Sequence, residues 1–545
     1  MTPLIMVWTI LGASGLNAPT DGYDTLVVCP PEFAPELRPW IAHRRSQGHR
    51  LTLQPSGTSA EIRAAIRQVA AAGSLQSVLL VGDAPGNPRL PQDQRLRTVP
   101  THLAKAQVNL RWGSEPEIGT DNWYADLDDD QIPDVAIGRL PATNRVQLRN
   151  MLGKILAYET TADQGEWRRR INLVAGVGGF GSLIDAVLEL TTQKFLTDGI
   201  PDSYATHMTY GSWQSPYCPN PMRFHEAVVQ RFNEGCLFWI YVGHGQRTAL
   251  DRVQVPGRSY HIFANRDVPK LAPTHAFPIA LFLACYAAAF DGPQDCLGEV
   301  LVRSTTGPVA VLGGTRVTMP YGMAVFANGL MDQLFREQRA TLGEVLLHAK
   351  RQLAAAPTKP DPADGVTSRQ LLDALGGAFA NSPQALAAER LEHLHLINLL
   401  GDPLLRIRQP QLIQVEAPAS AVAGQTVLIR IDTPIPGSCS LELICRRGRL
   451  RNPHPARSKF DPAADALNRY DQTYDDSNRQ TWSRRQLSTS AGSVALKLTI
   501  PTAARGACQV RVFVAGQKAH AQGSANLFVK RPTDASPNRS RSPSG

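Results

Sequence analysis

Two apolar runs decide the fold: Cys-Leu-Phe-Trp-Ile-Tyr-Val-Gly-His-Gly at 236–245 and Pro-Ile-Ala-Leu-Phe-Leu-Ala-Cys at 278–285. Continuous apolar runs of this length are typical of parallel strands that are buried on both faces. Each run ends in a reactive side chain, His244 in the first and Cys285 in the second. Because ligands bind beyond the carboxyl ends of parallel strands, we expect these two side chains to share one crevice.

The same alternation of strands and helices extends on both sides of these runs. Further buried strands are predicted at 24–29, 51–55, 77–84, 171–177 and 308–313. Helices are predicted between them at 33–48, 58–73, 181–196, 221–233, 297–303, 323–337 and 341–353. This order predicts an α/β fold of mainly parallel sheets flanked by helices. We expect two subdomains, an N-terminal one over 22–165 and a catalytic one over 166–410.

The pattern changes near residue 410. Residues 411–531 alternate apolar and polar side chains between turn residues, which is typical of an antiparallel β-sandwich. A polar, basic insert at 446–485 interrupts that pattern. The tail at 532–545 is rich in Ser, Pro and Arg and is predicted to be disordered.

Length and charge exclude several classes of protein. A chain of 545 residues with 43% hydrophobic and 19% charged residues is neither a disulfide-stapled mini-protein nor wholly disordered. The net charge is +9, and the insert carries +5 of it and residues 531–545 another +2. The α/β part is therefore near neutral, which argues against an enzyme of nucleic acids. The appended domain is left either with a weak, salt-sensitive contact to an anionic surface or with a solvated loop and tail.

The N-terminus resembles a signal peptide over residues 1–18, with a short apolar core followed by small residues. No Lys or Arg precedes that core, so a disordered leader or a misassigned start is the alternative. No later run is long and apolar enough for a membrane span. We therefore expect export to the periplasm, the cell surface or the medium. Cys439 or Cys445 would then pair with Cys508, or all three would remain free thiols.

The chemistry suggested by the two strand ends is nucleophilic. A Cys285 thiolate needs a neighbouring base or cation, and His244 can take its proton and later protonate a leaving amine. The N–H groups of Gly245 and Cys285 would form an oxyanion hole. The alternative is a buried cysteine and an ordinary glycine turn, because neither feature is specific alone.

Several ordered blocks make the dyad more specific, because together they resemble the gingipain-type cysteine peptidases of the caspase-like clan. The sequence Phe-Trp-Ile-Tyr-Val-Gly-His-Gly followed by Ala-Leu-Phe-Leu-Ala-Cys-Tyr resembles the catalytic pair of that family. Similar blocks run from about Asp24 to Arg408, among them the acidic stretch at 119–141, the segment at 296–315 and Gly401-Asp402-Pro403. The resemblance implies a caspase-like fold followed by an immunoglobulin-like β-sandwich. It also implies that Cys285 is the nucleophile and His244 the general base and acid.

The specificity of the family does not transfer with its catalytic pair. The arginine-specific members carry a Glu after the strand that corresponds to 171–177, where this chain has Val-Gly-Gly. Asp185 lies nearby but does not match that position securely. Arg316 would favour an acidic substrate side chain if it faces the pocket, and otherwise it pairs with a surface carboxylate.

A second feature is the acidic loop with Asp126, Asp128, Asp130 and Asp134 at relative positions 1, 3, 5 and 9. This spacing is typical of loops that surround Ca²⁺ with oxygen atoms. Gln131 replaces the usual glycine, so the loop is not an EF-hand. We expect a structural calcium ion that catalysis does not require, with an unliganded acidic turn as the alternative. His393 and His395 alternate in a strand-like segment and are interpreted as packing residues.

The leading hypothesis is a cysteine endopeptidase that hydrolyses protein or peptide substrates through an acyl-enzyme. Two alternatives remain open at this point. The first is a catalytically silent surface or adhesion module that kept the fold. The second is a peptide acyl transferase, or ligase, in which an amine instead of water takes the acyl group.

Overall fold

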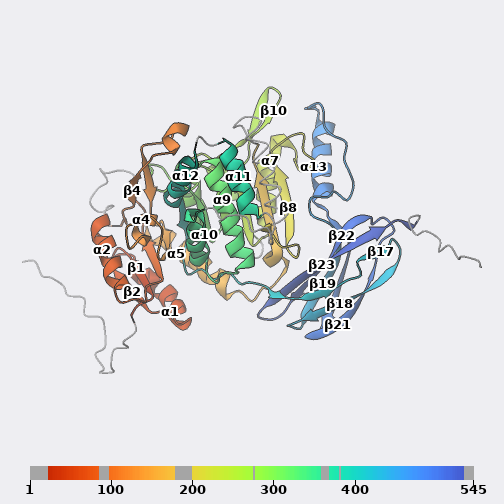
Figure 1. The fold of residues 1–545 in the computed structure, drawn as a ribbon, viewed down its shortest axis with the longest axis horizontal. Helices are drawn as coiled ribbons and strands as arrows, with labels where there is room; N and C mark the ends of the chain where they lie inside the picture. Colours follow the sequence, from red (N-terminus) through yellow and green to blue (C-terminus); the bar gives the residue numbers. More distant parts are fainter. Residues whose placement is uncertain are drawn as a thin grey trace, which may run out of the picture.

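The computed structural model describes residues 22–84, 97–177, 199–273, 277–356, 367–379 and 382–532 (Figure 1). Its α/β part is built on one ten-stranded sheet. In spatial order the strands are β2 (Leu51–Gln54), β1 (Thr25–Val28), β3 (Ser77–Val81), β6 (Ala136–Leu140), β14 (Ile397–Leu400), β13 (Ala310–Gly314), β12 (Ile279–Leu283), β9 (Phe238–Val242), β7 (Arg170–Ala175) and β8 (Ala205–Tyr210). Every neighbouring pair is parallel except β13 and β14, which run antiparallel. The predicted α/β class is confirmed.

The sheet has two halves that meet at one seam. The strands β1, β2, β3 and β6 come from the first 140 residues, and the others come from residues 170–400. The seam is the short parallel contact of β6 with β14, where Leu400 lies opposite Arg139. The two subdomains that the sequence suggests therefore share a single sheet.

Helices cover both faces of this sheet (Figure 1). In the first half they are α1 (Arg38–Ser46), α2 (Ser59–Ala70), α4 (Asn122–Ala125) and α5 (Arg145–Thr160). In the second half they are α7 (Phe224–Asn233), α8 (Leu297–Arg303), α9 (Pro320–Met331), α10 (Leu342–Ala354), α11 (Ser368–Phe379) and α12 (Pro383–Leu396). In β1, Leu26 and Val28 pack towards α2, whereas Val27 packs with Trp40 of α1, as the two-residue period of a strand requires. A capping box of Thr58 and Glu61 begins α2.

Two sequence expectations differ from the structure or fall outside its description. His393 and His395 lie in α12, and the strand begins only at Ile397, so the strand-like interpretation of that segment was wrong. Polar and apolar side chains can alternate in a helix as they do in a strand when more than one side of the helix is packed. Here α12 also passes directly into β14 without an intervening turn, so no turn residue marks the boundary. The helix predicted at 181–196 and the signal peptide predicted at 1–18 lie outside the described residues.

The C-terminal part is a β-sandwich. One sheet contains β15 (Gln411–Leu412), β17 (Ser420–Val422), β19 (Gly437–Cys445), β20 (Thr481–Thr489), β22 (Gly506–Ala515) and β23 (His520–Lys530). The other contains β16 (Gln414–Glu416), β18 (Thr426–Thr433) and β21 (Gly492–Thr499). Cys445 lies opposite Cys508 in the antiparallel pair of β19 and β22, and both thiols are free. The predicted sandwich is confirmed, and its immunoglobulin-like topology stays a prediction.

The basic insert is a docked helix as well as a loop. It contains α13 (Ala464–Asn478), and its last residues begin β20. The helix lies against the α/β part beside β8 (Figure 1), where the Tyr474 hydroxyl hydrogen-bonds that of Thr209 at 2.8 Å and Asp475 pairs with Arg231 at 2.9 Å. Part of the insert's charge is thus used in packing the two parts of the chain together.

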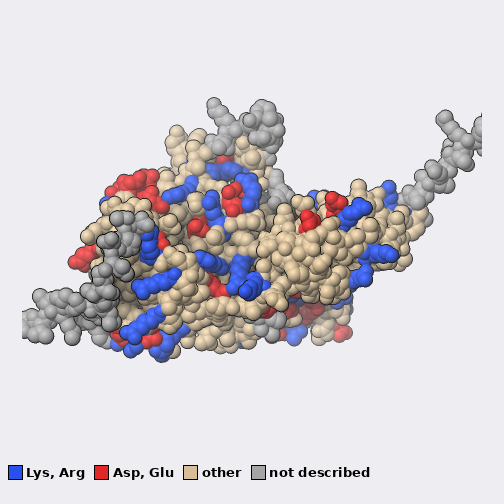
Figure 2. Space-filling view, turned by 90° about the horizontal axis from the view of Figure 1, so that it is seen from below, with Lys and Arg blue, Asp and Glu red and all other residues tan. Residues whose placement is uncertain are grey.

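The surface shows charges of both signs. On the face drawn in Figure 2, basic side chains are scattered among acidic and uncharged ones, and broad uncharged areas separate them. The contact with an anionic surface stays a prediction. Among the described residues, no helix combines the length and the apolar character that crossing a membrane requires.

Candidate active site

The register of β9 and β12 brings His244 and Cys285 to the same level of the sheet. The two strands are adjacent and parallel, and Val242 lies opposite Leu283. His244 and Cys285 each follow two residues later, at the carboxyl ends of the strands. Neighbouring strands lie about 4.8 Å apart, so this register brings the two residues to neighbouring positions at the edge where α/β sheets bind ligands.

Glycines allow the backbone of the loop that carries His244 (the histidine loop, Gly243-His244-Gly245) to approach Cys285. Gly243 has φ +149° and donates its N–H to Leu283 O at 3.4 Å. At Gly245 a β-carbon would lie 2.3 Å from Cys285 O and 3.0 Å from the Ala284 β-carbon. Any larger residue at 245 would therefore push the histidine loop away from the cysteine.

Cys285 differs from the other cysteines in its exposure. It is the one partly exposed cysteine of the eight in the chain, all of which lie in described segments. Burial raises the pKa of the Cys29, Cys236 and Cys508 thiols to about 12, which keeps them protonated and inert. Accessibility thus selects Cys285 as the thiol that can meet a substrate.

Thr318, in the loop after β13, holds the Cys285 sulfur. The Thr318 N–H donates to Sγ at 3.3 Å, and its hydroxyl lies 3.5 Å from the same sulfur. The thiol in turn donates to Thr318 O at 3.8 Å. An N–H donor on the sulfur fixes the direction in which the Cys285 side chain points.

The residue after the cysteine has strained backbone. Tyr286 has φ +56°, which is uncommon for a residue other than glycine. Its N–H donates to Arg316 O at 3.3 Å, and its hydroxyl donates to Glu115 at 2.6 Å. Such strain is typical of sharp turns that present a nucleophile at the end of a strand.

Tyr241 and Asp251 support the histidine from behind. The Tyr241 hydroxyl donates to His244 O at 2.7 Å and accepts the Asp251 N–H at 3.3 Å. Burial raises the pKa of the Asp251 carboxyl, while the Arg252 N–H and the electrostatic interaction with His244 each lower it in part. The carboxylate is therefore within electrostatic reach of the imidazole. The sequence pattern singles out neither residue, and the only signal for them is their position within seven residues of His244.

Of the two specificity residues suggested by the sequence, the structure describes Arg316 only. The Arg316 guanidinium is buried, donates to Asp291 and bonds Glu117 O at 2.8 Å, so its charge is already paired. This arrangement matches the pairing alternative, although the carboxylate is buried and not at the surface. Asp185 lies outside the described residues.

The acidic loop brings three of its four predicted ligands together. One carboxylate oxygen from each of Asp126, Asp128 and Asp130 lies within 4.8 Å of the others. Asp134 stands apart from this group and accepts the Leu127 N–H at 2.7 Å. The oxygen donors of the three aspartates are of the kind that Ca²⁺ prefers, and the loop is at the surface, so these residues fit the ion.

Arg63 is a competing cation at the same loop. It lies 3.4 Å from an Asp126 oxygen and 2.8 Å from an Asp129 oxygen. The arginine relieves part of the repulsion between the carboxylates without an ion. Calcium binding therefore stays a prediction that an experiment must decide.

Comparison with known proteins finds a family match over nearly all of the α/β part. The model of peptidase family C25 matches residues 18–408. Lys-gingipain of Porphyromonas gingivalis is 23% identical over 307 residues, which are 53% of this chain but 15% of that protein. The Lys-gingipain of strain W83 aligns similarly, at 23% identity over 303 residues. The chain thus spans a small part of the length of these relatives.

Solved structures share the fold. The Arg-specific cysteine proteinase gingipain R has a TM-score of 0.51 at 17% identity, with 94% of this chain and 98% of that chain covered. The complex of the pro- and mature domains of RgpB from Porphyromonas gingivalis has a TM-score of 0.51 at 17% identity, with 93% and 100% covered. At such low identity the likeness establishes the fold, which includes the sandwich after the α/β part.

Proposed function

This chain belongs to peptidase family C25, and from that premise we propose that it is a cysteine endopeptidase in which Cys285 is the nucleophile and His244 the general base and acid. The observation that carries the proposal is the register of β9 and β12, in which Val242 lies opposite Leu283, two residues before His244 and Cys285 respectively. The exposure of Cys285 alone among the cysteines supports the same assignment.

The reaction would proceed in two steps. His244 takes the thiol proton, and the Cys285 sulfur attacks the scissile carbonyl carbon to form a tetrahedral oxyanion. The N–H groups of Gly245 and Cys285 would stabilise that charge, each worth about 3–4 kcal/mol in acyl transfer. The C–N bond then breaks, His244 gives its proton to the leaving amine, and a thioester remains. Water, deprotonated by His244, attacks the thioester and releases the acid and the free thiol.

Three further residues would position the dyad. Thr318 directs the sulfur through its N–H, and Tyr241 holds the main chain of His244. Asp251 supplies negative charge that stabilises the imidazolium formed when His244 takes the proton. The proposed substrates are peptides or proteins, and the proposed site of action is outside the cytoplasm.

The side chain that precedes the cleaved bond is left to experiment. The curated relatives are named for lysine and the solved one for arginine. In this chain Arg316 is paired with Asp291, and neither observation selects a basic or an acidic substrate. Cleavage of a peptide library and sequencing of the products would assign the preference directly.

A thiol-reactive fluorescent peptide probe tests the proposal. We expect the wild type to be labelled and Cys285→Ala to be unlabelled. The matched control is Cys445→Ala, which removes a buried thiol in the sandwich and should be labelled like the wild type. Absence of labelling in wild type with calcium present, or its persistence in Cys285→Ala, would overturn the assignment. Product analysis with an added amine separates hydrolysis from ligation.

A further inference from the structure

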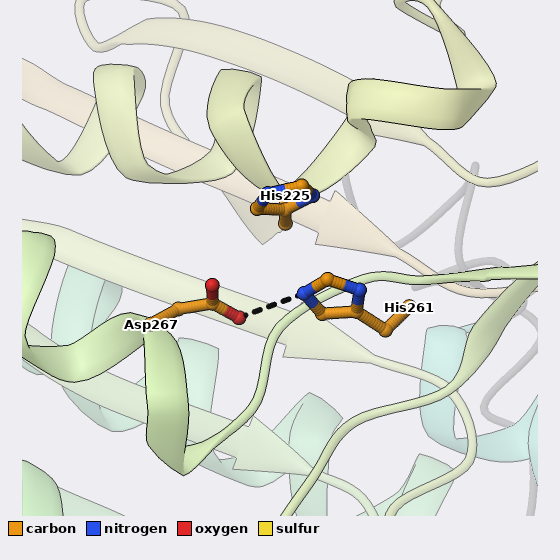
Figure 3. Close-up of side chains that lie close together, drawn as sticks. All are labelled: His225, His261 and Asp267. Carbon is orange, nitrogen blue, oxygen red and sulfur yellow. Dashed lines mark hydrogen bonds and ion pairs between the residues drawn. The ribbon is translucent and has the colours of Figure 1, made fainter.

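Three side chains outside the proposed catalytic machinery converge near the histidine loop: His225, His261 and Asp267 (Figure 3). His225 lies in the first turn of α7, after the short helix η5 (Pro221–Arg223). His261 ends β11 (Arg258–His261), which forms a hairpin with β10 (Arg252–Val255). Asp267 lies in the short helix η6 (Asn265–Lys270). Three separate elements thus each contribute one potential metal ligand.

The distances between these side chains are close to those of a metal site. One ligand atom from each residue lies within 4.8 Å of the others, and His261 Nε2 lies 3.0 Å from Asp267 Oδ2. The rings of His225 and His261 stack with their centroids 4.3 Å apart. In a tetrahedral zinc site, bonds of about 2.0–2.1 Å place neighbouring ligand atoms about 3.3 Å apart. The pair of His261 and Asp267 already has this spacing, and His225 needs only a small side-chain shift.

We propose that His225, His261 and Asp267 bind a divalent transition metal ion, for which zinc is the best match, with water as the fourth ligand. Two imidazoles and one carboxylate form a donor set that suits zinc, whereas calcium and magnesium prefer oxygen atoms alone. The site is therefore chemically distinct from the acidic loop at 126–134.

The state of the ligands before metal binding supports the assignment. The Nδ1 atom of His225 is buried and has no hydrogen-bond partner among the described residues. A buried imidazole nitrogen without a hydrogen-bond partner is expected where a metal ion supplies the missing contact.

Two contacts to Asp267 compete with a metal or tune it. Ala264 donates its N–H to Oδ2 at 3.1 Å, and the Lys270 ammonium lies 2.9 Å from Oδ1. The Lys270 side chain is 52% exposed, so it can swing into solvent when a cation binds. Because the Lys270 ammonium repels a cation bound at Asp267, we expect weaker binding than in a closed structural zinc site.

The position of the site gives it a structural role. The chain between His261 and Asp267 runs beside the loop that follows His244: Leu250 donates its N–H to Phe263 O at 2.8 Å, and Ile262 donates to Asp251 O at 3.0 Å. An ion that ties this segment to α7 would restrain the segment against which that loop packs. The inference does not depend on the proposed peptidase activity.

Metal titration of the Cys285→Ala chain tests the site, because that background removes the one accessible thiol that would itself bind zinc. With calcium saturating, calorimetry with Zn²⁺ and the visible absorption of Co²⁺ should each show one ion per chain. We expect His225→Gln and His261→Gln to weaken binding at least tenfold. The control is His348→Gln, which changes a half-buried histidine of α10 outside the cluster and should leave binding unchanged.

Two results would overturn the proposal: no stoichiometric binding by the Cys285→Ala chain, or equal binding by both histidine variants. Should the variants fail to fold, zinc K-edge absorption of the Cys285→Ala chain decides instead. Scattering from two imidazoles and no sulfur supports the site, and scattering from one imidazole or from sulfur contradicts it.

Discussion

The α-carbon of Gly245 lies so close to the main chain of Cys285 that a β-carbon at 245 would come within 2.3 Å of the Cys285 oxygen. The two residues belong to different strand ends, and their contact couples the histidine loop to the proposed nucleophile. Nothing flexible can yield at this point, because the obstructing atom is backbone. The spacing between His244 and Cys285 therefore depends on the absence of a β-carbon at residue 245.

Gly245→Ala should lower kcat/KM by about 100-fold, since a displacement near 1 Å at a reacting group costs that much. Overpacking should also lower stability by about 1–3 kcal/mol. Peptide hydrolysis and thermal unfolding measure the two effects. The control is Gly153→Ala in α5, where a β-carbon meets no atom within 4 Å and activity should be unchanged. Full activity in Gly245→Ala would show that the close approach is not needed.

Tyr241→Phe should lower kcat by about tenfold with little change in KM, because the hydroxyl holds the His244 carbonyl and the Asp251 N–H. Leaving these groups unpaired should cost about 1–3 kcal/mol of stability. Tyr124→Phe is the matched control, since Tyr124 is also buried and donates to Pro100 O at 2.6 Å, far along the chain from the dyad. Equal losses of kcat in the two variants would mean that the effect is one of stability alone.

Asp251→Asn should lower kcat through loss of charge beside His244. The Asp251 pKa is raised above its ordinary value, chiefly by burial, so its carboxylate is lost on acidification earlier than that of an exposed aspartate. The ratio of wild-type to variant kcat should thus rise with pH through the Asp251 titration and level off above it. A pH–rate profile of both proteins measures this ratio. A ratio that does not vary with pH would assign Asp251 a packing role only.

Chelation of calcium should lower the melting temperature if Asp126, Asp128 and Asp130 hold the ion. In Asp128→Asn this response should be reduced, and without calcium that variant should be no less stable than wild type because one of the repelling charges is gone. Asp134→Asn should keep the calcium response, since Asp134 caps the Leu127 N–H instead of joining the group. A melting temperature that does not change on chelation would show that the acidic loop does not bind calcium.

The sequence could single out His244 and Cys285, the proposed catalytic pair, because strand ends are a local property. An apolar run marks a buried strand, and two parallel strands place their carboxyl ends at one edge wherever they lie in the chain. The sequence analysis did not find Thr318, whose contact with the Cys285 sulfur joins residues 33 positions apart in different loops. The pairing of Arg316 with Asp291 was equally invisible, because the geometry of an ion pair depends on the packed loops.

The insert at 446–485 contains a helix that its composition did not predict. Its polar composition indicated a solvated loop, yet Leu467, Tyr470 and Tyr474 lie buried on one side of α13. Their spacing of three and four residues is a helical signal, but a short one among many charges. The apolar face of α13 is buried by β8 and α7, and their position beside the insert cannot be read from the sequence of the insert itself.

Glu442 offers the test of how the sandwich and the α/β part hold together. It is 3% exposed and pairs with Arg511 of its own domain at 2.8 Å and with Arg169 of the α/β part at 3.0 Å. Burial raises the pKa of the Glu442 carboxyl, but the two arginines outweigh burial and lower it from 4.5 to about 2. A depressed carboxyl pKa stabilises the fold above the unfolded value, near pH 4.5, and that contribution is lost as pH falls towards 2.

Glu442→Gln should therefore destabilise the protein by about 3 kcal/mol at pH 7, because the buried guanidinium groups of Arg511 and Arg169 each lose a carboxylate partner, although Arg169 keeps that of Glu166. The difference between wild type and variant should shrink as pH falls from 4.5 to 2. Denaturant unfolding at a series of pH values measures it. Glu416→Gln, at an exposed carboxylate on β16, serves as the control and should change stability little at any pH. A Glu442→Gln deficit that persists undiminished at pH 2 would show that the ion pair contributes through packing instead of charge.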